Sequence, residues 1–230
     1  DVLTITANGE PTLYPHLADF IATIKPFLPQ SAKSLILSNG SRFGEKSVQN
    51  ALAHFDMVKF SLDSGCQKTY KKIDRIHKSL DLDLIKNGIE SYAKIRRNLL
   101  ICEILLVKNI NDNDESMKPL ADFLRKIGVD RVDIGTIDRP PAYNVEAVDF
   151  DKISSISTLF YGLCVSNPKR KNLAQDSRES NALNLNEREI LDLLKRRPLE
   201  VNEVREMLGG ESFARLQNLQ DLRKIRTKRV

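Results

Sequence analysis

Small, polar and acidic residues recur directly after short apolar runs in this sequence. Gly9 and Glu10 follow the run VLTITA, and Asn39 follows KSLILS. Ser61 and Asp63 lie at the end of MVKFSLD. Groups of these types bind the ammonium, hydroxyl and amide groups of small polar ligands. We expect a ligand site wherever the fold brings these positions together.

Three further positions extend this candidate site. Glu103 interrupts the apolar run LLICEILLV, where an unpaired carboxylate would cost on the order of several kcal/mol. We therefore predict that Glu103 faces a ligand or a basic partner in the interior. Gly135 and Thr136 lie near the end of the run RVDIGTI.

Two charged segments could bind an anion. Arg75 and His77 precede an expected helix in KKIDRIHKSLDL, and Arg139 lies beside two prolines in IDRPPAY. Arginine in a rigid segment suits recognition of a carboxylate or phosphate. Exposed surface charge is the alternative for all three. Three other candidates also have a purely structural alternative. Glu10 could serve just to place a negative charge at a helix N-terminus, Asn39 just to form a turn, and Asp63 just to cap a helix.

The elements that must position these residues alternate along the chain. Strands are expected at 2–7, 33–38, 57–63, 99–107 and 131–137, and helices at 16–28, 45–54, 80–95, 114–127 and 149–161. The spacing is that of βαβ units, and the continuous apolar runs predict a parallel sheet that is buried on both faces. In such an α/β array the ligand site forms at the carboxyl ends of the strands.

The C-terminal part has a different character. Residues 167–183 are polar and aperiodic and are expected to be a linker between a domain at 1–166 and a small domain at 184–230. The latter contains three helical segments and then a basic strand, as in a winged helix that is cut short at Val230. Asn186 and Glu189 predict a helix capping box.

Composition narrows the function classes. About 41% of the 230 residues are hydrophobic, yet no apolar run reaches the roughly 20 residues of a membrane span and no leader is visible. We expect a cytoplasmic protein without membrane contact. Cys66, Cys102 and Cys164 are too widely spaced for a disulfide framework or a metal site. Residues 168–230 hold 15 Lys or Arg against 10 Asp or Glu, which accounts for the whole net charge of +5. This excess indicates either a polyanionic partner or simply a basic solvated surface.

The ordered runs ITANGEPTLYPHL, LILSNGS, FDMVKFSLDS, KTYKKIDRIHKSLDL, EILLVKNINDNDE and VDRVDIGTIDRPPAY resemble one family. The family is the iron–sulfur oxidoreductase branch of the radical S-adenosylmethionine (SAM) enzymes, similar to the wyosine-forming tRNA-modifying enzymes. The resemblance covers about residues 1–150 and implies an α/β fold, a partial (β/α)6 TIM-like barrel without its first βα unit.

The resemblance also implies a chemistry. A [4Fe-4S] cluster on a C-x3-C-x2-C loop would bind SAM, and reductive cleavage of SAM would generate a 5′-deoxyadenosyl radical. An electron donor such as flavodoxin or ferredoxin is implied as a partner. Kinship with tRNA modifiers and the basic C-terminal segment are consistent with RNA as the substrate, and a protein or a small molecule is the open alternative.

The resemblance assigns roles to individual residues. Gly9 and Glu10 match the Gly-Gly-Glu element that holds the methionine ammonium. Asn39, Ser61 and Asp63 match positions that face the ribose or the methionyl part. Gly135 and Thr136 match the strand that contacts adenine, and Glu103 completes the expected cofactor set. Arg75, His77 and Arg139 match motif positions without an assigned role.

Three departures from the family pattern stand out. The cysteine loop is absent, so this chain is expected to be a fragment that is inactive without its cluster ligands. Ile76 replaces a usual Pro, and Asn109 replaces a frequent Gly. Two alternatives stay open: a non-catalytic module that binds nucleic acid or protein through the winged helix, with Arg215, Arg223 and Lys224 on phosphates, and an aldolase or isomerase that uses Glu103 or Lys108.

Overall fold

The protein is described by a computed structural model of residues 1–74, 81–138, 143–168, 184–196, 199, 204 and 207–225. Two compact units can be distinguished. The first combines Asp1–Ile137 with Val145–Lys169, and the second combines Asp138–Asn144 with Arg170–Val230. The predicted linker at 167–183 falls mostly outside the described residues, so the predicted domain boundaries stay a prediction.

The first unit is built on a parallel sheet of six strands in sequential order. The strands are β1 (Val2–Ile5), β2 (Lys33–Ser38), β3 (Met57–Ser61), β4 (Leu99–Leu106), β5 (Arg131–Thr136) and β6 (Val165–Ser166). Every neighbouring pair is parallel. The α/β class and the five expected strands are confirmed. β6 was not expected because two residues carry no pattern.

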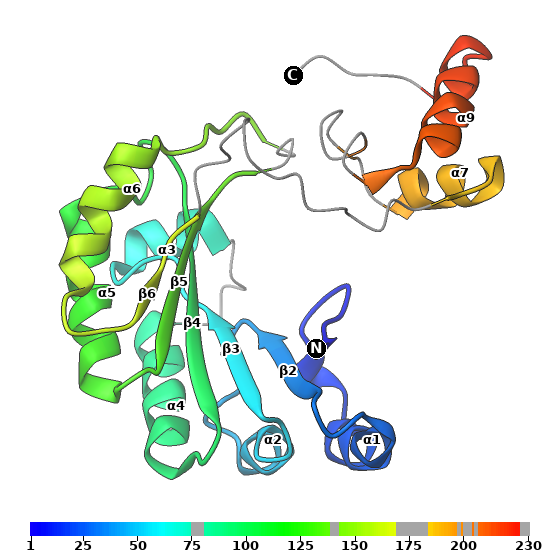
Figure 1. Ribbon diagram of the computed structural model, residues 1–230. Coiled ribbons are helices and arrows are strands. Elements are labelled where there is room, and N and C mark those ends of the chain that lie inside the picture. The colour runs from blue at the N-terminus through cyan, green and yellow to red at the C-terminus, as the bar shows by residue number, and fades with distance from the viewer. Residues whose placement is uncertain are drawn as a thin grey trace. The chain divides into compact units, whose positions relative to one another are not determined.

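Helices cover one face of this sheet (Figure 1). They are α1 (Leu17–Ile24), α2 (Lys46–Leu52), α3 (Gln67–Asp74), α4 (Leu82–Ile95), α5 (Asp114–Ile127) and α6 (Phe150–Ser157), with short 3-10 turns η1 (Pro11–Leu13), η2 (Lys25–Phe27) and η3 (Thr158–Phe160). The sequence pattern does not predict α3, because Tyr70 is its one fully buried side chain.

The strands are buried mainly on one face, whereas most positions on the other face are partly exposed and Ile101 is buried there, which corrects the expectation of burial on both faces. Side chains at alternate positions, such as Val58, Phe60 and Cys102, pack against the helices with no exposed surface. The intervening positions form an open face, on which Leu99 is 50% exposed. Successive side chains of a strand point to opposite faces, so the sequence places every second residue on this open face.

The second unit has its own small core. α7 (Glu187–Arg196) contacts α9 (Gly210–Asp221), and Ile190, Leu216 and Leu219 are buried between them. The predicted capping box is confirmed by hydrogen bonds of 2.8 and 3.0 Å between Asn186 and Glu189. Most of the second predicted helical segment and nearly all of the predicted basic strand lie outside the described residues, so the winged helix stays a prediction.

Among the described residues, no helix combines the length and the apolar character that crossing a bilayer requires.

Candidate functional site

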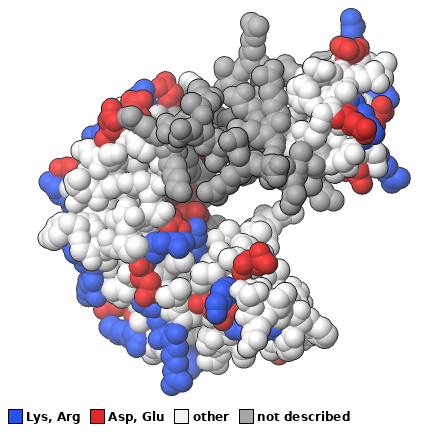
Figure 2. Space-filling view, in the orientation of Figure 1, with Lys and Arg blue, Asp and Glu red and all other residues white. Residues whose placement is uncertain are grey.

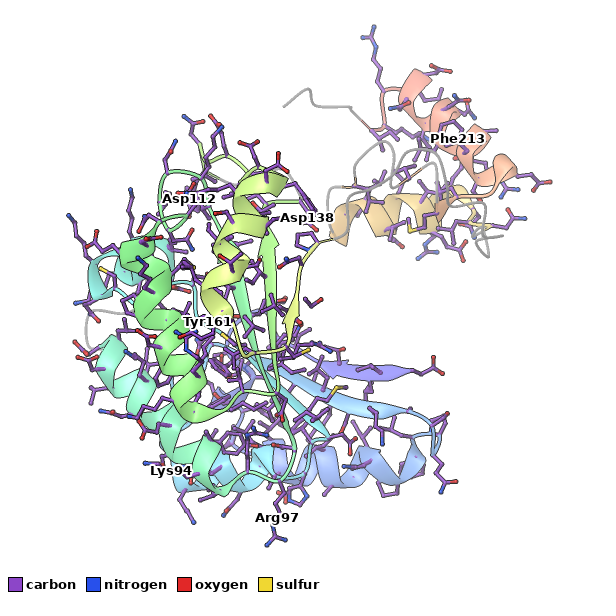
Figure 3. The ribbon with its side chains drawn as sticks, turned by 60° about the vertical axis from the view of Figure 1, so that its left-hand side comes forward. Lys94, Arg97, Asp112, Asp138, Tyr161 and Phe213 are labelled. Carbon is purple, nitrogen blue, oxygen red and sulfur yellow. The ribbon has the colours of Figure 1, made fainter. Side chains whose placement is uncertain are left out.

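The candidate site lies at one end of the sheet. Figure 3 shows both ends: Lys94 and Arg97 lie before β4, and Asp112 lies beyond its carboxyl end. The loop after β1 and the ends of β2 and β3 share the end to which Asp112 belongs, because all strands are parallel. This common edge brings together the predicted positions on five strands.

Glu10 fastens the loop after β1 to the end of β2. Its Oε1 atom accepts hydrogen bonds from the backbone nitrogen and hydroxyl of Thr12, at 3.1 and 2.6 Å, and from the hydroxyl of Ser38 at 2.7 Å. Its Oε2 atom accepts from the backbone nitrogen of Asn39 at 2.7 Å. The carboxylate is therefore occupied by the protein, and Glu10 acts first as a structural clamp.

The clamp leaves the tip of the loop accessible. Gly9 is exposed, and a Cβ atom placed there would meet no other atom within 4 Å. Arg42 reinforces the loop by donating to the carbonyl of Thr12 at 2.9 Å. The side-chain oxygen of Asn39 accepts from the backbone nitrogen of Ser41, so this residue forms the turn given as its alternative role. A rigid loop with open backbone groups can bind a ligand ammonium.

Ser61 and Glu103 are neighbours on the open face. They are register partners on β3 and β4, and Glu103 pairs in turn with Asp133 on β5. The Glu103 side chain is 46% exposed, and its Oε1 atom lies 3.4 Å from Nζ of Lys59. The expectation that Glu103 faces a basic partner is thus met by Lys59. Gly135 follows on the same face of β5 and is partly exposed.

Glu103 belongs to a row of charged side chains on the open face, which we call the charged row; its other members are Lys59, Asp133 and Arg131. Lys59 Nζ lies 2.8 Å from Oδ2 of Asp133, and Arg131 donates to both oxygens of Asp133 at 2.6 and 3.0 Å. Burial, the largest influence, favours a higher pKa for Asp133, but the hydrogen bonds from Arg131 and Lys59 hold the pKa below its ordinary value. Figure 2 shows that Lys and Arg alternate with Asp and Glu over the visible described surface.

Sequence reasoning missed three members of this row, Lys59, Arg131 and Asp133. A signal was present, since charged residues at every second position of a strand otherwise rich in Val and Ile predict one polar face.

Two predicted ligand residues make hydrogen bonds within the protein, and their role toward a ligand stays a prediction. Asp63 is 7% exposed, and its Oδ1 atom accepts from the backbone nitrogen of Leu105 at 2.8 Å. The hydroxyl of Thr136 donates to the carbonyl of Leu106 at 2.9 Å and accepts from the backbone nitrogen of Val148 at 2.8 Å. Both side chains hold neighbouring segments to the carboxyl ends of the strands.

Asn111 joins the ends of β3 and β4 and was also missed. It is fully buried, its amide donates to the carbonyls of Asp63 and Leu105 at 2.7 and 2.8 Å, and its oxygen accepts from Val107 at 2.7 Å. The preceding Asn109 has a φ of 59°. Asparagine tolerates this left-handed conformation, which explains why it can replace glycine there.

Arg75, His77 and Arg139 lie outside the described residues, as does Ile76. Lys108 is partly exposed, and its Nζ lies 2.9 Å from Oε2 of Glu146. The hydrogen bond to Glu146 raises the pKa of Lys108. A lysine nucleophile needs the opposite shift, so this geometry counts against the aldolase alternative.

A hollow of about 590 Å³ lies away from these residues, on the outer surface of α1. We assign the site to the sheet, because the hollow contains none of the polar groups that converge at the strand ends. It is lined by Tyr14, His16, Asp19, Phe20, Thr23 and Ile24.

The cysteines present do not fit an iron–sulfur cluster. Cys66 is partly exposed, Cys102 is buried and Cys164 is exposed, and all three are free thiols. Within the described part of the chain, no group of three or more His, Cys, Asp or Glu residues could hold a metal ion. The described residues thus contain no group that fits an iron–sulfur cluster.

Two carboxyl groups, that of Asp63 just after β3 and that of Asp74 at the end of α3, predict a pH effect. Burial raises the pKa of Asp63 to about 7 and that of Asp74 to about 8, and each carboxylate also has an acidic neighbour. Asp74 is partly buried as a residue, and its Oδ2 atom is buried without a hydrogen-bond partner in the described part of the chain. The folded state thus holds protons that the unfolded chain, with a pKa of about 3.9, has released. The free energy of unfolding should fall as pH rises from about 4 to about 8.

The variant Asp74→Asn isolates this effect. Relative to the wild type it should gain roughly 1 to 2 kcal/mol of unfolding free energy between pH 5 and pH 8, measured by urea denaturation. Asp83→Asn, which changes an exposed acid on α4, is the control. Parallel pH curves for Asp74→Asn and wild type would contradict the prediction.

Comparisons with known proteins agree with this geometry at the level of the fold. A domain of a pyruvate-formate lyase-activating enzyme from Bacteroides vulgatus matches with a TM-score of 0.58 and 16% identity, over 73% of this chain and 98% of that chain. A radical SAM methyltransferase from Sphaerobacter thermophilus matches with a TM-score of 0.58 and 14% identity, over 72% and 50%. SuiB from Streptococcus suis, bound to S-adenosylmethionine, matches with a TM-score of 0.56 and 15% identity, over 74% and 40%.

The chain therefore has the fold of the radical SAM enzymes, with an open six-stranded sheet that corresponds to a partial TIM-like barrel. The UPF0026 protein of Helicobacter pylori is 45% identical over 230 residues, which are 100% of this chain and 73% of that protein. The chain belongs to the UPF0026 family. No family model matches it.

Proposed function

We propose that this protein is a radical SAM enzyme that binds S-adenosylmethionine across the carboxyl ends of β1 to β5. The observation that carries the proposal is the loop after β1, which Glu10 fixes to β2 through four hydrogen bonds while Gly9 stays open. The loop lies at the same sheet edge as the half-exposed Glu103. A SAM-bound neighbour with the same fold supports this choice of ligand.

The chemical types of the residues at the strand ends suit the functional groups of SAM. Open backbone at Gly9 would hold the methionine ammonium. Glu103 would accept hydrogen bonds from hydroxyl groups, and the hydroxyl of Ser61 would accept or donate them. Gly135 lets the ligand approach the backbone of β5, because it carries no side chain on the open face. When bound, SAM would supply a carbon radical by one-electron reductive cleavage at a [4Fe-4S] cluster.

The cluster requires ligands that the described residues lack. We propose that these ligands lie in another part of a longer protein, in line with a relative of which this chain covers 73%. We further propose membership of the branch similar to the wyosine-forming enzymes, a cytoplasmic location, and flavodoxin or ferredoxin as the electron donor. The resemblance of the strand-end motifs supports these three points.

RNA is the substrate class that we propose, on the basis of the basic segment at 168–230. Of the three cations suggested for phosphate contacts, Arg215 instead binds Asn184 and the carbonyl of Leu185, at 3.1 and 3.0 Å. Arg223 and Lys224 are exposed. This engagement of Arg215 leaves a purely nucleic-acid-binding module with less support than the enzyme.

The test uses the full-length protein, reconstituted anaerobically with iron and sulfide. After reduction with dithionite, we expect release of 5′-deoxyadenosine from SAM. Glu103→Gln should slow this release about tenfold, because it removes a charged acceptor at the ligand surface. Glu146→Gln, on an exposed carboxylate that pairs with Lys108, should not. Reconstituted protein that neither binds nor cleaves SAM would overturn the proposal.

A further inference from the structure

The charged row on the open face has two mostly buried side chains in its middle and a half-exposed side chain at each end. Its members are Arg131, Asp133, Lys59 and Glu103. We propose that Lys59 and Asp133 are positioning residues, which hold the carboxylate of Glu103 in place for a hydroxyl-bearing part of the ligand. The inference rests on the proposed function and deepens it, since neither Lys59 nor Asp133 is among the predicted site residues.

The distances define which contacts are tight. Asp133 is held by two hydrogen bonds from Arg131, at 2.6 and 3.0 Å, and lies 2.8 Å from Nζ of Lys59. The contact from Lys59 to Oε1 of Glu103 is longer, at 3.4 Å. Lys59 is therefore anchored by Asp133 and only orients Glu103.

Exposure separates the middle of the row from its ends, and Arg131 at one end is 44% exposed. The side chains of Lys59 and Asp133 are 15% and 18% exposed, whereas Glu103 is 46% exposed. A lysine that is this far removed from water needs its anionic partner, because an unpaired buried charge is costly. Glu103 retains solvent contact, so a ligand can reach it without breaking the Lys59–Asp133 pair.

The strand register sets the position of the row relative to the site. Glu103 lies between Ser61 on β3 and Asp133 on β5, all at one level of the sheet. Lys59 lies two residues before Ser61, on the same face. Lys59 thus contacts Glu103 from the amino-terminal side of the strands, and the carboxyl edge of the sheet stays open for the ligand.

A structural role alone would also explain a charged row on a sheet. The two explanations differ in one respect. If Lys59 only stabilises the sheet, removing it weakens ligand binding equally whether or not Glu103 is present. If Lys59 acts through Glu103, the effect on binding disappears once Glu103 has lost its charge.

The experiment is a double-mutant cycle on SAM binding. Full-length protein with the cluster oxidised, so that no turnover occurs, is titrated with SAM by equilibrium dialysis. We expect Glu103→Gln to raise the Kd about tenfold and Lys59→Met roughly fivefold. In the double variant, Lys59→Met should add less than about twofold to Glu103→Gln.

Two further variants, with a control, distinguish loss of the Lys59–Asp133 interaction from misfolding. Lys59→Arg keeps the cation and should bind within about twofold of wild type. Asp133→Asn should weaken binding through Lys59, and again only while Glu103 is intact. Lys68→Met, on an exposed lysine of α3, is the control for loss of a positive charge. Thermal unfolding of every variant reports whether it is folded.

The outcomes separate the two claims. Wild-type protein that fails to bind SAM overturns the proposed function and this inference together. Wild-type binding with additive effects of Lys59→Met and Glu103→Gln, or with no effect of Lys59→Met, overturns the inference and leaves the proposed function standing.

Discussion

Gly65→Ala is expected to lower the free energy of unfolding by about 3 kcal/mol or more. Gly65 follows β3 where the chain passes directly against α5, and its backbone nitrogen donates to the carbonyl of Ser116 at 2.8 Å. A Cβ atom at this position would contact the backbone nitrogen of Leu120 and lie 2.7 Å from the carbonyl carbon of Pro119. Backbone atoms inside a helix cannot move aside as a flexible side chain can.

Urea denaturation of Gly65→Ala and Gly9→Ala checks this expectation. Gly9 has open space around the added methyl group, so its variant should unfold within about 0.5 kcal/mol of wild type. Equal stabilities for the two variants would show that α5 does not approach the loop after β3 as described.

Glu10→Ala is expected to reduce both stability and ligand affinity. The substitution removes the acceptor of two backbone nitrogens, those of Thr12 and Asn39, and of two hydroxyls. We expect a loss of about 2 kcal/mol in unfolding free energy. The affinity of the full-length protein for SAM should fall at least about thirtyfold, because the loop with Gly9 is no longer held at the strand ends.

Glu10→Gln sharpens the test. An amide can keep the shape of the side chain, but its NH2 group would face the backbone N–H of Asn39 or the donors on Thr12 and Ser38. We expect it to bind SAM more weakly than wild type and better than Glu10→Ala. Asp19→Asn, on an exposed acid of α1, is the control. Wild-type affinity in Glu10→Ala would show that the clamp does not shape the site.

The sequence by itself determined the class of fold and the edge at which the site lies. Apolar runs such as KSLILS favour burial. Successive runs are separated by about the length of one helix, which is the spacing of strands in a parallel sheet. Polar residues after those runs must then meet at one edge. The helix capping box at Asn186 was also predictable, because its hydrogen bonds join residues that are close together in the sequence.

Only the tertiary structure decided which of those polar groups are available to a ligand. Glu10, Asp63 and Thr136 have the right types and positions, yet their oxygens accept or donate hydrogen bonds within the protein. Lys59 and Asp133 became visible as a pair only when β3, β4 and β5 were placed side by side. The hydrogen-bond partners and buried charge pairs at this edge come from residues that are distant in the chain. The sequence pattern places these residues at the same edge of the sheet, but it does not specify which side chains pair with each other.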